Sequence, residues 1–179
     1  MRASVQGSML NVTQGNGIDM RDRLQTMAVA YAEICQGERP WTALGNFMND
    51  WFGCAKDRRE QLVADPLPTP QALTQETHRW AAFIAASVEW LCQKYAVRCP
   101  LWVHNPVYVL AETWWYADGI QKLHVRARLL EETPEPFARR NIYCGNRMYN
   151  NKYEVDDLID QLLEARKSAT KNHDQPVLL

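Results

Sequence analysis

The residues best suited to chemistry or recognition lie close together near the end of the chain, between positions 139 and 153. Cations alternate there with tyrosines and asparagines. The cations are Arg139, Arg140, Arg147 and Lys152, and the tyrosines are Tyr143, Tyr149 and Tyr153. Cations can contact phosphates, tyrosines can stack on bases, and asparagine can bond base edges. Arginine and tyrosine are also favoured anchors of protein interfaces. The segment therefore indicates a protein-binding surface, a nucleic-acid surface, or a solvated loop whose aromatic rings pack on the domain.

The charge distribution favours a protein partner over nucleic acid. The total charge is only −1, so no global field would hold the chain on nucleic acid or on an anionic membrane. Residues 121–152 nevertheless contain seven basic and three acidic residues, a net charge of +4. Residues 19–65 carry six basic and eight acidic residues, and residues 153–179 carry three and six. A basic strip over 122–128 and 139–152 keeps nucleic-acid binding or transcriptional regulation open as an alternative.

Recognisable catalytic motifs are missing from the sequence, including the phosphate-binding glycine loop, the dinucleotide fingerprint, the zinc-protease helix and the nucleophile elbow. The histidines are separated by at least twenty residues, so one helix cannot present two of them to a metal. They are His78, His104, His124 and His173. We expect no metal and no cofactor, and we favour a non-enzymatic protein. An enzyme of unrecognised type is the third alternative, and its only testable groups are His104, Cys144, Asp50 and Glu89.

Two of those groups have a plainer interpretation. His104 lies in a turn beside aromatic residues, where it could act as a base, but a hydrogen-bonded turn residue is the favoured interpretation. Cys144 lies among arginines that could lower its pKa, but we favour a small apolar core residue. The odd number and scattered positions of the five cysteines predict free thiols in a reducing cytoplasm. No apolar run has the length of a signal peptide or a membrane span.

Apolar residues recurring at spacings of three and four predict a mainly all-α domain, a bundle of six or seven helices with little or no sheet. The main expected helices cover residues 21–36, 41–53, 74–95, 120–130 and 154–163, and residues 56–64 form a short charged segment. Residues 80–95 carry the longest apolar stripe, which predicts the central helix. In the helix at 120–130, the predicted apolar stripe is Ile120, Leu123, Ala127 and Leu130. Residues 107–116 could be helix or strand, and residues 141–144 read as a short extended piece before a turn.

The expected domain covers residues 18–169, between a flexible N-terminal extension at 1–17 and a flexible tail at 170–179. A proline-rich connector at 65–70 divides it internally. The acidic helix at 154–163 has a narrow stripe made of Val155, Leu158, Ile159, Leu162 and Leu163. Such a stripe suits docking on a partner helix or on the parent domain, and we favour docking within the chain.

Several sequence motifs between residues 40 and 143 resemble those of an uncharacterised family of small bacterial helical proteins. They are P-W-x-x-L-x-x-F-x-x-x-W from Pro40 to Trp51, the tryptophan- and alanine-rich run from Trp80 to Cys92, P-x-W-V at Pro100 to Val103, and R-R-N-I-Y at Arg139 to Tyr143. The resemblance implies a partner encoded beside nucleotidyltransferase-like proteins, in arrangements suggestive of toxin and antitoxin pairs. The chain departs from the family pattern after Tyr143, and the resemblance implies no catalytic residues.

The favoured hypothesis is therefore a non-enzymatic, antitoxin-like protein-interaction module. It would bind another bacterial protein through Arg139, Arg140, Tyr143, Arg147, Tyr149, Lys152 and Tyr153. The hypothesis leaves open whether the chain also forms a homo-oligomer.

Overall fold

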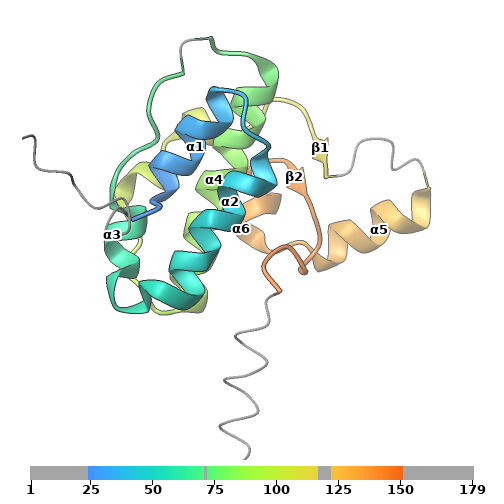
Figure 1. Cartoon of the computed structure of the whole chain (residues 1–179). Helices are drawn as coiled ribbons and strands as arrows, with labels where there is room; N and C mark the ends of the chain where they lie inside the picture. Colours follow the sequence, from blue (N-terminus) through green and yellow to red (C-terminus); the bar gives the residue numbers. More distant parts are fainter. Residues whose placement is uncertain (1–23, 71, 117–121, 151–179) are drawn as a thin grey trace, which may run out of the picture.

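One long helix, α4 (Gln75–Lys94), organises the structure and has twelve buried residues along its length. It packs against α1, α6 and the turns that follow it, as Figure 1 shows for the helices. This is a computed structural model in which residues 24–70, 72–116 and 122–150 are described. Five expectations lie outside those ranges: the extension at 1–17, the helix at 154–163, the tail at 170–179, the positions of Lys152 and Tyr153, and the place of Ile120 in the predicted stripe at 120–130.

The described residues form six α-helices and one two-stranded pairing, which confirms a mainly all-α fold. The helices are α1 (Met27–Cys35), α2 (Pro40–Asn49), α3 (Arg59–Ala64), α4, α5 (Leu123–Glu132) and α6 (Glu135–Ala138). A π-helical turn extends α2 through Asp50–Cys54, and 3-10 turns cover Lys56–Arg58, Leu101–His104 and Pro106–Tyr108. None of the helices in the described ranges is both long and apolar enough to cross a membrane.

Local sequence explains where the main helices begin. Thr26 caps α1 by accepting a hydrogen bond from the Val29 amide at 3.2 Å, so residues 24–26 lie outside the helix that was expected to include them. Pro40 occupies the first turn of α2, where its missing amide hydrogen costs nothing. Thr74 and Thr77 cap α4 reciprocally, each side chain accepting from the other residue's amide.

The aromatic surplus of the sequence is largely core material. Trp80 and Phe83 of α4 lie at the centre of a network of edge-on ring contacts with centroid separations of 5.4–6.1 Å. Other rings of that network include Trp41, Trp114 and Tyr116. Such contacts add stabilisation beyond the area that the rings bury. These tryptophans therefore hold α2, α4 and the segment around residue 114 together.

The segment at 107–116, which the sequence left between helix and strand, contains a 3-10 turn and then β1 (Trp114–Trp115). β1 pairs in parallel with β2 (Ile142–Tyr143), matching Trp114 to Ile142 and Trp115 to Tyr143. The expected extended piece at 141–144 is thus confirmed. The pairing places the two segments side by side although they are far apart in the sequence.

The apolar stripe predicted for α5 faces solvent and not the core of the domain. Leu123 is 81% exposed, Leu130 is 53% exposed and Ala127 is also exposed, whereas Leu129 is only 9% exposed. The helix has a second apolar pair, Val125 and Leu129, and spacing alone does not say which side meets the domain. Figure 1 shows α5 extending away from the helices α1, α2 and α4. The stripe Leu123–Ala127–Leu130 therefore lies on the surface.

Replacing Thr74 with alanine should lower the free energy of unfolding by about 1 kcal/mol, because the Thr77 amide at the start of α4 loses its side-chain acceptor. Urea denaturation would measure this. Thr42→Ala, at an exposed position within α2, is the matched control and should change stability by no more than about 0.5 kcal/mol. Equal losses in both variants would contradict the capping role.

Candidate functional site

Arg140, one of the predicted partner contacts, is buried inside the domain. It is 2% exposed, and its guanidinium donates to Glu89 Oε2 at 2.8 Å, to the Pro136 carbonyl at 2.6 Å and to the Val103 carbonyl at 2.7 Å. Glu89, on α4, is 3% exposed. Burial lowers the pKa of Arg140, while the hydrogen bond and charge of Glu89 oppose that shift. Arg140 therefore joins α4, α6 and the 3-10 turn at 101–104, and it is not available to a partner.

Arg139 lies at the edge of the same cluster and is partly exposed. It forms an ion pair with Glu89 and a longer one with Glu135 at 3.7 Å, and its Nη2 lies 3.4 Å from His104 Nδ1. Two guanidiniums thus face two carboxylates. The cluster has no surplus positive charge, which weakens the interpretation of Arg139 and Arg140 as phosphate contacts.

The four groups considered for catalysis do not assemble into a nucleophile and base. Glu89 and His104 approach one another only through Arg139. Asp50 accepts a hydrogen bond from the Gln25 amide at 2.8 Å, near the start of α1. Cys144 is buried, and burial raises its pKa to about 12, so the favoured interpretation as an inert core thiol agrees with the structure. The described residues also contain no group of three or more His, Cys, Asp and Glu side chains arranged to hold a metal ion.

Tyr149, a second predicted contact, is also buried. Its ring stacks on Trp90 with centroids 5.4 Å apart, and its hydroxyl donates a hydrogen bond to Ser87 of α4. Burial raises its pKa well above the ordinary value. For Arg140 and Tyr149, the alternative of side chains packed on the domain is the one that the structure favours.

Tyr143 and Arg147 are accessible members of the predicted set. The Tyr143 ring stacks on Trp115 at 5.0 Å, and the guanidinium of Arg126 on α5 lies 5.1 Å from the Trp115 ring centroid. This aromatic and cationic group joins the β1–β2 pairing to α5. Arg147 is exposed. Tyr143 therefore lies near α5, the element whose exposed face the sequence did not predict.

We call the surface formed by Leu123, Ala127 and Leu130 the α5 face. Its orientation depends on the chain just after β2: the amides of Cys144 and Gly145 donate to Thr133 Oγ1 at 3.0 and 2.8 Å, directly after α5 ends. Gly145 has φ +72°, and a Cβ there would lie 3.3 Å from Leu129 Cδ2. Because of this close approach, Leu129 packs against the chain at Gly145, and the opposite side of α5 stays in solvent. The spacing of four and three residues between Leu123, Ala127 and Leu130 was visible in the sequence, but the sequence did not show that these side chains are exposed.

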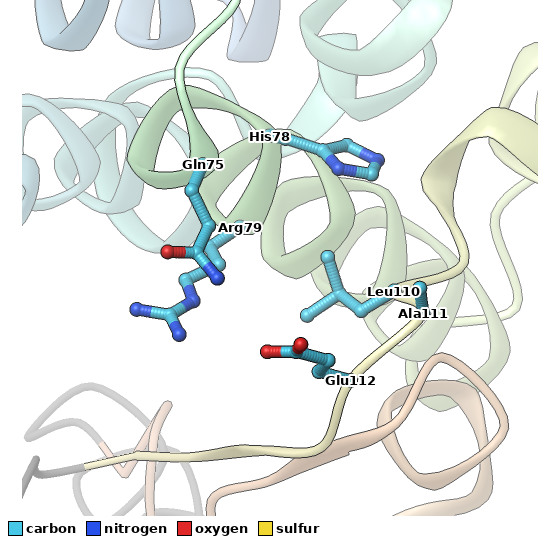
Figure 2. A pocket seen from close by; sticks show the side chains of 6 residues that line it. All are labelled: Gln75, His78, Arg79, Leu110, Ala111 and Glu112. Atoms are coloured by element: carbon cyan, nitrogen blue, oxygen red, sulfur yellow. The ribbon is translucent and has the colours of Figure 1, made fainter.

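The hollows on the surface are shallow and mixed in character. One, of about 240 Å³, lies between the start of α4 and residues 110–112 (Figure 2). Its polar lining residues are Gln75, His78, Arg79 and Glu112, and the Nε2 of His78 lies 2.6 Å from the Val107 carbonyl. Another, of about 280 Å³, is lined by His104, Asn105 and Arg139 among others. Neither hollow brings together a catalytic pair, so the α5 face is the stronger candidate for function.

Comparison with known proteins adds no relative to this description. No family model, no curated protein and no solved structure matches the chain.

Replacing Arg140 with alanine should lower the free energy of unfolding by about 3–5 kcal/mol, because Glu89 would stay buried with part of its compensation removed. Chemical denaturation would measure the loss. Arg147→Ala removes an exposed arginine seven residues away and should change stability by no more than about 0.5 kcal/mol. An Arg140→Ala protein as stable as the parent chain would disprove the anchoring role.

The buried thiols should make the chain less stable at high pH. Burial raises the pKa of Cys92 and of Cys144 from 9.0 to about 12, so the unfolded chain releases these protons at a lower pH than the folded chain. The unfolded state then binds fewer protons, so the free energy of unfolding falls as the pH rises from 9.0 toward about 12.

Cys144→Ala should make the free energy of unfolding fall less steeply with rising pH, because one of the two buried thiols is removed. Urea unfolding at several pH values would measure this slope. Cys54→Ala, which removes an exposed thiol, should leave the slope nearly unchanged. The same slope in Cys144→Ala and the parent chain would contradict the assignment.

Proposed function

We propose that this chain is a cytoplasmic, non-enzymatic interaction module that binds a partner protein through the α5 face. The observation that supports the proposal is the exposure of Leu123 and Leu130, two leucines seven residues apart on one side of a helix, with Ala127 between them. Apolar anchors at such spacing are how amphipathic helices recognise one another. An exposed apolar stripe with a polar rim is typical of an interaction site.

The charged residues around the α5 face indicate which kind of partner it would bind. Lys122 and Arg128 are exposed near it, Arg128 with its Nε 3.9 Å from Glu132 Oε1, and Arg126 lies against Trp115. The acidic residues of α5, Glu131 and Glu132, come only at its last turn. A partner helix with leucines at matching spacing and acidic flanks would cover the apolar centre and face the cations. Rim charges of this kind mainly affect the association rate and its dependence on salt.

Part of the originally expected surface belongs to this proposal. Tyr143, through its stack on Trp115, and the exposed Arg147 are candidates for the edge of the interface. Arg140 and Tyr149 support it from inside by fixing β2 and the chain after it. The resemblance of residues 40–143 to small bacterial proteins encoded beside nucleotidyltransferase-like proteins suggests the first partner to try, in an antitoxin-like pair.

The nucleic-acid alternative has less support from the described residues. A continuous basic strip would need free cations on α5 and on residues 139–140. Arg126 instead lies on Trp115, and Arg139 and Arg140 share Glu89. The proposal therefore rests on apolar anchoring with a basic rim.

Leu123→Asp combined with Leu130→Asp should reduce the amount of captured partner at least tenfold, because two apolar anchors become charged. Quantitative mass spectrometry of proteins captured from nuclease-treated native lysate would measure this amount. The folded state should be unaffected, since both side chains are exposed. Surface plasmon resonance with the captured protein, purified, would then give the change in affinity.

The matched control is Leu73→Asp with Leu101→Asp, which charges two leucines that are 76% and 87% exposed elsewhere on the surface. The control should bind like the parent chain. Partner capture that survives the α5 substitutions, or that is lost only on nuclease treatment, would overturn the proposal.

A further inference from the structure

The α5 face lies next to the place where the described chain ends. Thr133, the residue after α5, binds the amides of Cys144 and Gly145, and the description of the chain stops five residues later, at Asn150. The following residues therefore start near the base of α5. Within the described ranges, Leu123 stays 81% exposed and Leu130 53% exposed.

The sequence that follows has the chemistry that the α5 face would select. In residues 154–164 five acids and no bases accompany an apolar stripe at helical spacing. The acids are Glu154, Asp156, Asp157, Asp160 and Glu164, and the stripe is Val155, Leu158, Ile159, Leu162 and Leu163. Lys122 immediately precedes α5, and the first two turns of the helix carry Arg126 and Arg128 and no acid. Arg128 Nε also lies 3.9 Å from Glu132 Oε1 in the last turn. Charge and apolar pattern are therefore complementary.

The lengths also match. As a helix, nine residues from Val155 to Leu163 would extend about 13 Å, and the ten residues of α5 extend about 15 Å at 1.5 Å per residue. Only residues 151–154 separate the end of the described chain from this stripe. Four linking residues can span roughly 13–18 Å, counting the bonds at both ends. A tether this short gives an effective concentration in the millimolar range, so even weak docking would be populated.

We propose that the acidic segment Val155–Leu163 docks on the α5 face of its own chain and masks it from partners. The inference deepens the proposed function, on which it rests: a partner would have to displace the segment before it reached Leu123 and Leu130. The chain would then be a self-masked module, and its affinity for a partner would be lowered by the fraction of time that the segment is docked. Raising the salt concentration would weaken the docking by screening the charges that favour it.

Hydrogen–deuterium exchange of the full chain tests the docking. Leu158→Asp with Leu162→Asp breaks the stripe and should make the amides of Leu123–Glu132 exchange roughly tenfold faster, because the helix loses its cover. Gln161→Asp with Ser168→Asp adds the same total charge, one within the segment off its apolar stripe and one five residues beyond it, and should leave α5 exchange unchanged. Unchanged exchange in the stripe variant would overturn the proposal.

A disulfide trap distinguishes docking within one chain from docking between two copies. Ala127→Cys with Ile159→Cys, in a chain carrying Cys54→Ser to remove the exposed thiol, should oxidise rapidly to a monomeric product. The control pair, Ala127→Cys with Gln161→Cys, places the second thiol off the stripe and should oxidise at least several-fold more slowly. A dimeric product would assign the face to a second copy, and equal rates would show no specific docking; either result overturns the proposal.

The two proposals fail separately. If Leu123→Asp with Leu130→Asp abolishes partner binding while the stripe variant changes neither α5 exchange nor partner affinity, the α5 face binds a partner but is not masked. If the exchange and trapping results hold and no partner depends on the α5 face, masking stands as a structural contact and the proposed function fails. If both hold, the stripe variant should bind the purified partner several-fold more tightly than the parent chain.

Discussion

Glu89 is buried in the middle of the central helix, and a carboxylate in that position must be compensated or the domain loses stability. Two successive arginines fifty and fifty-one residues later provide the compensation, one wholly inside and one at the edge of the domain. The inner guanidinium also satisfies two backbone carbonyls, from α6 and from the 3-10 turn after α4. A buried charge with this many partners tolerates few alternative arrangements. It fixes the last third of the described chain against α4.

The rest of that region follows from this anchor. Asn141 adopts a left-handed conformation with φ +60° directly after the arginines, and its side chain donates to the Leu110 carbonyl at 2.6 Å. β2 is thereby placed beside β1, and Trp115 meets Tyr143. The chain then turns at Gly145, where Leu129 of α5 is seated. The orientation of α5, and with it the exposure of Leu123 and Leu130, is thus a distant consequence of charge compensation on α4.

This arrangement divides the basic, tyrosine-rich segment into two roles. Arg140 and Tyr149 hold the structure together from inside, through Glu89 and Ser87 of α4. Tyr143 and Arg147 stay at the surface, near a helix whose outer side is apolar with a basic rim. Recognition by such a surface depends on a complementary apolar and acidic segment, and the sequence Val155–Leu163 is the candidate that we propose within the chain. Partner binding and self-masking would then compete for the same two leucines.

Local pattern alone determined the helical class and the central helix, because the stripe at 80–95 and the caps at Thr74 and Pro40 depend only on neighbours in sequence. It also indicated the short extended piece at 141–144. It did not determine which cations and tyrosines are buried, since Arg140 is drawn inside by a carboxylate fifty-one residues away and Tyr149 by a serine sixty-two residues away. Nor could it orient α5, which has one apolar pair on each side: only the tertiary contact of Leu129 with Gly145 decided that the stripe containing Leu123 and Leu130 faces solvent.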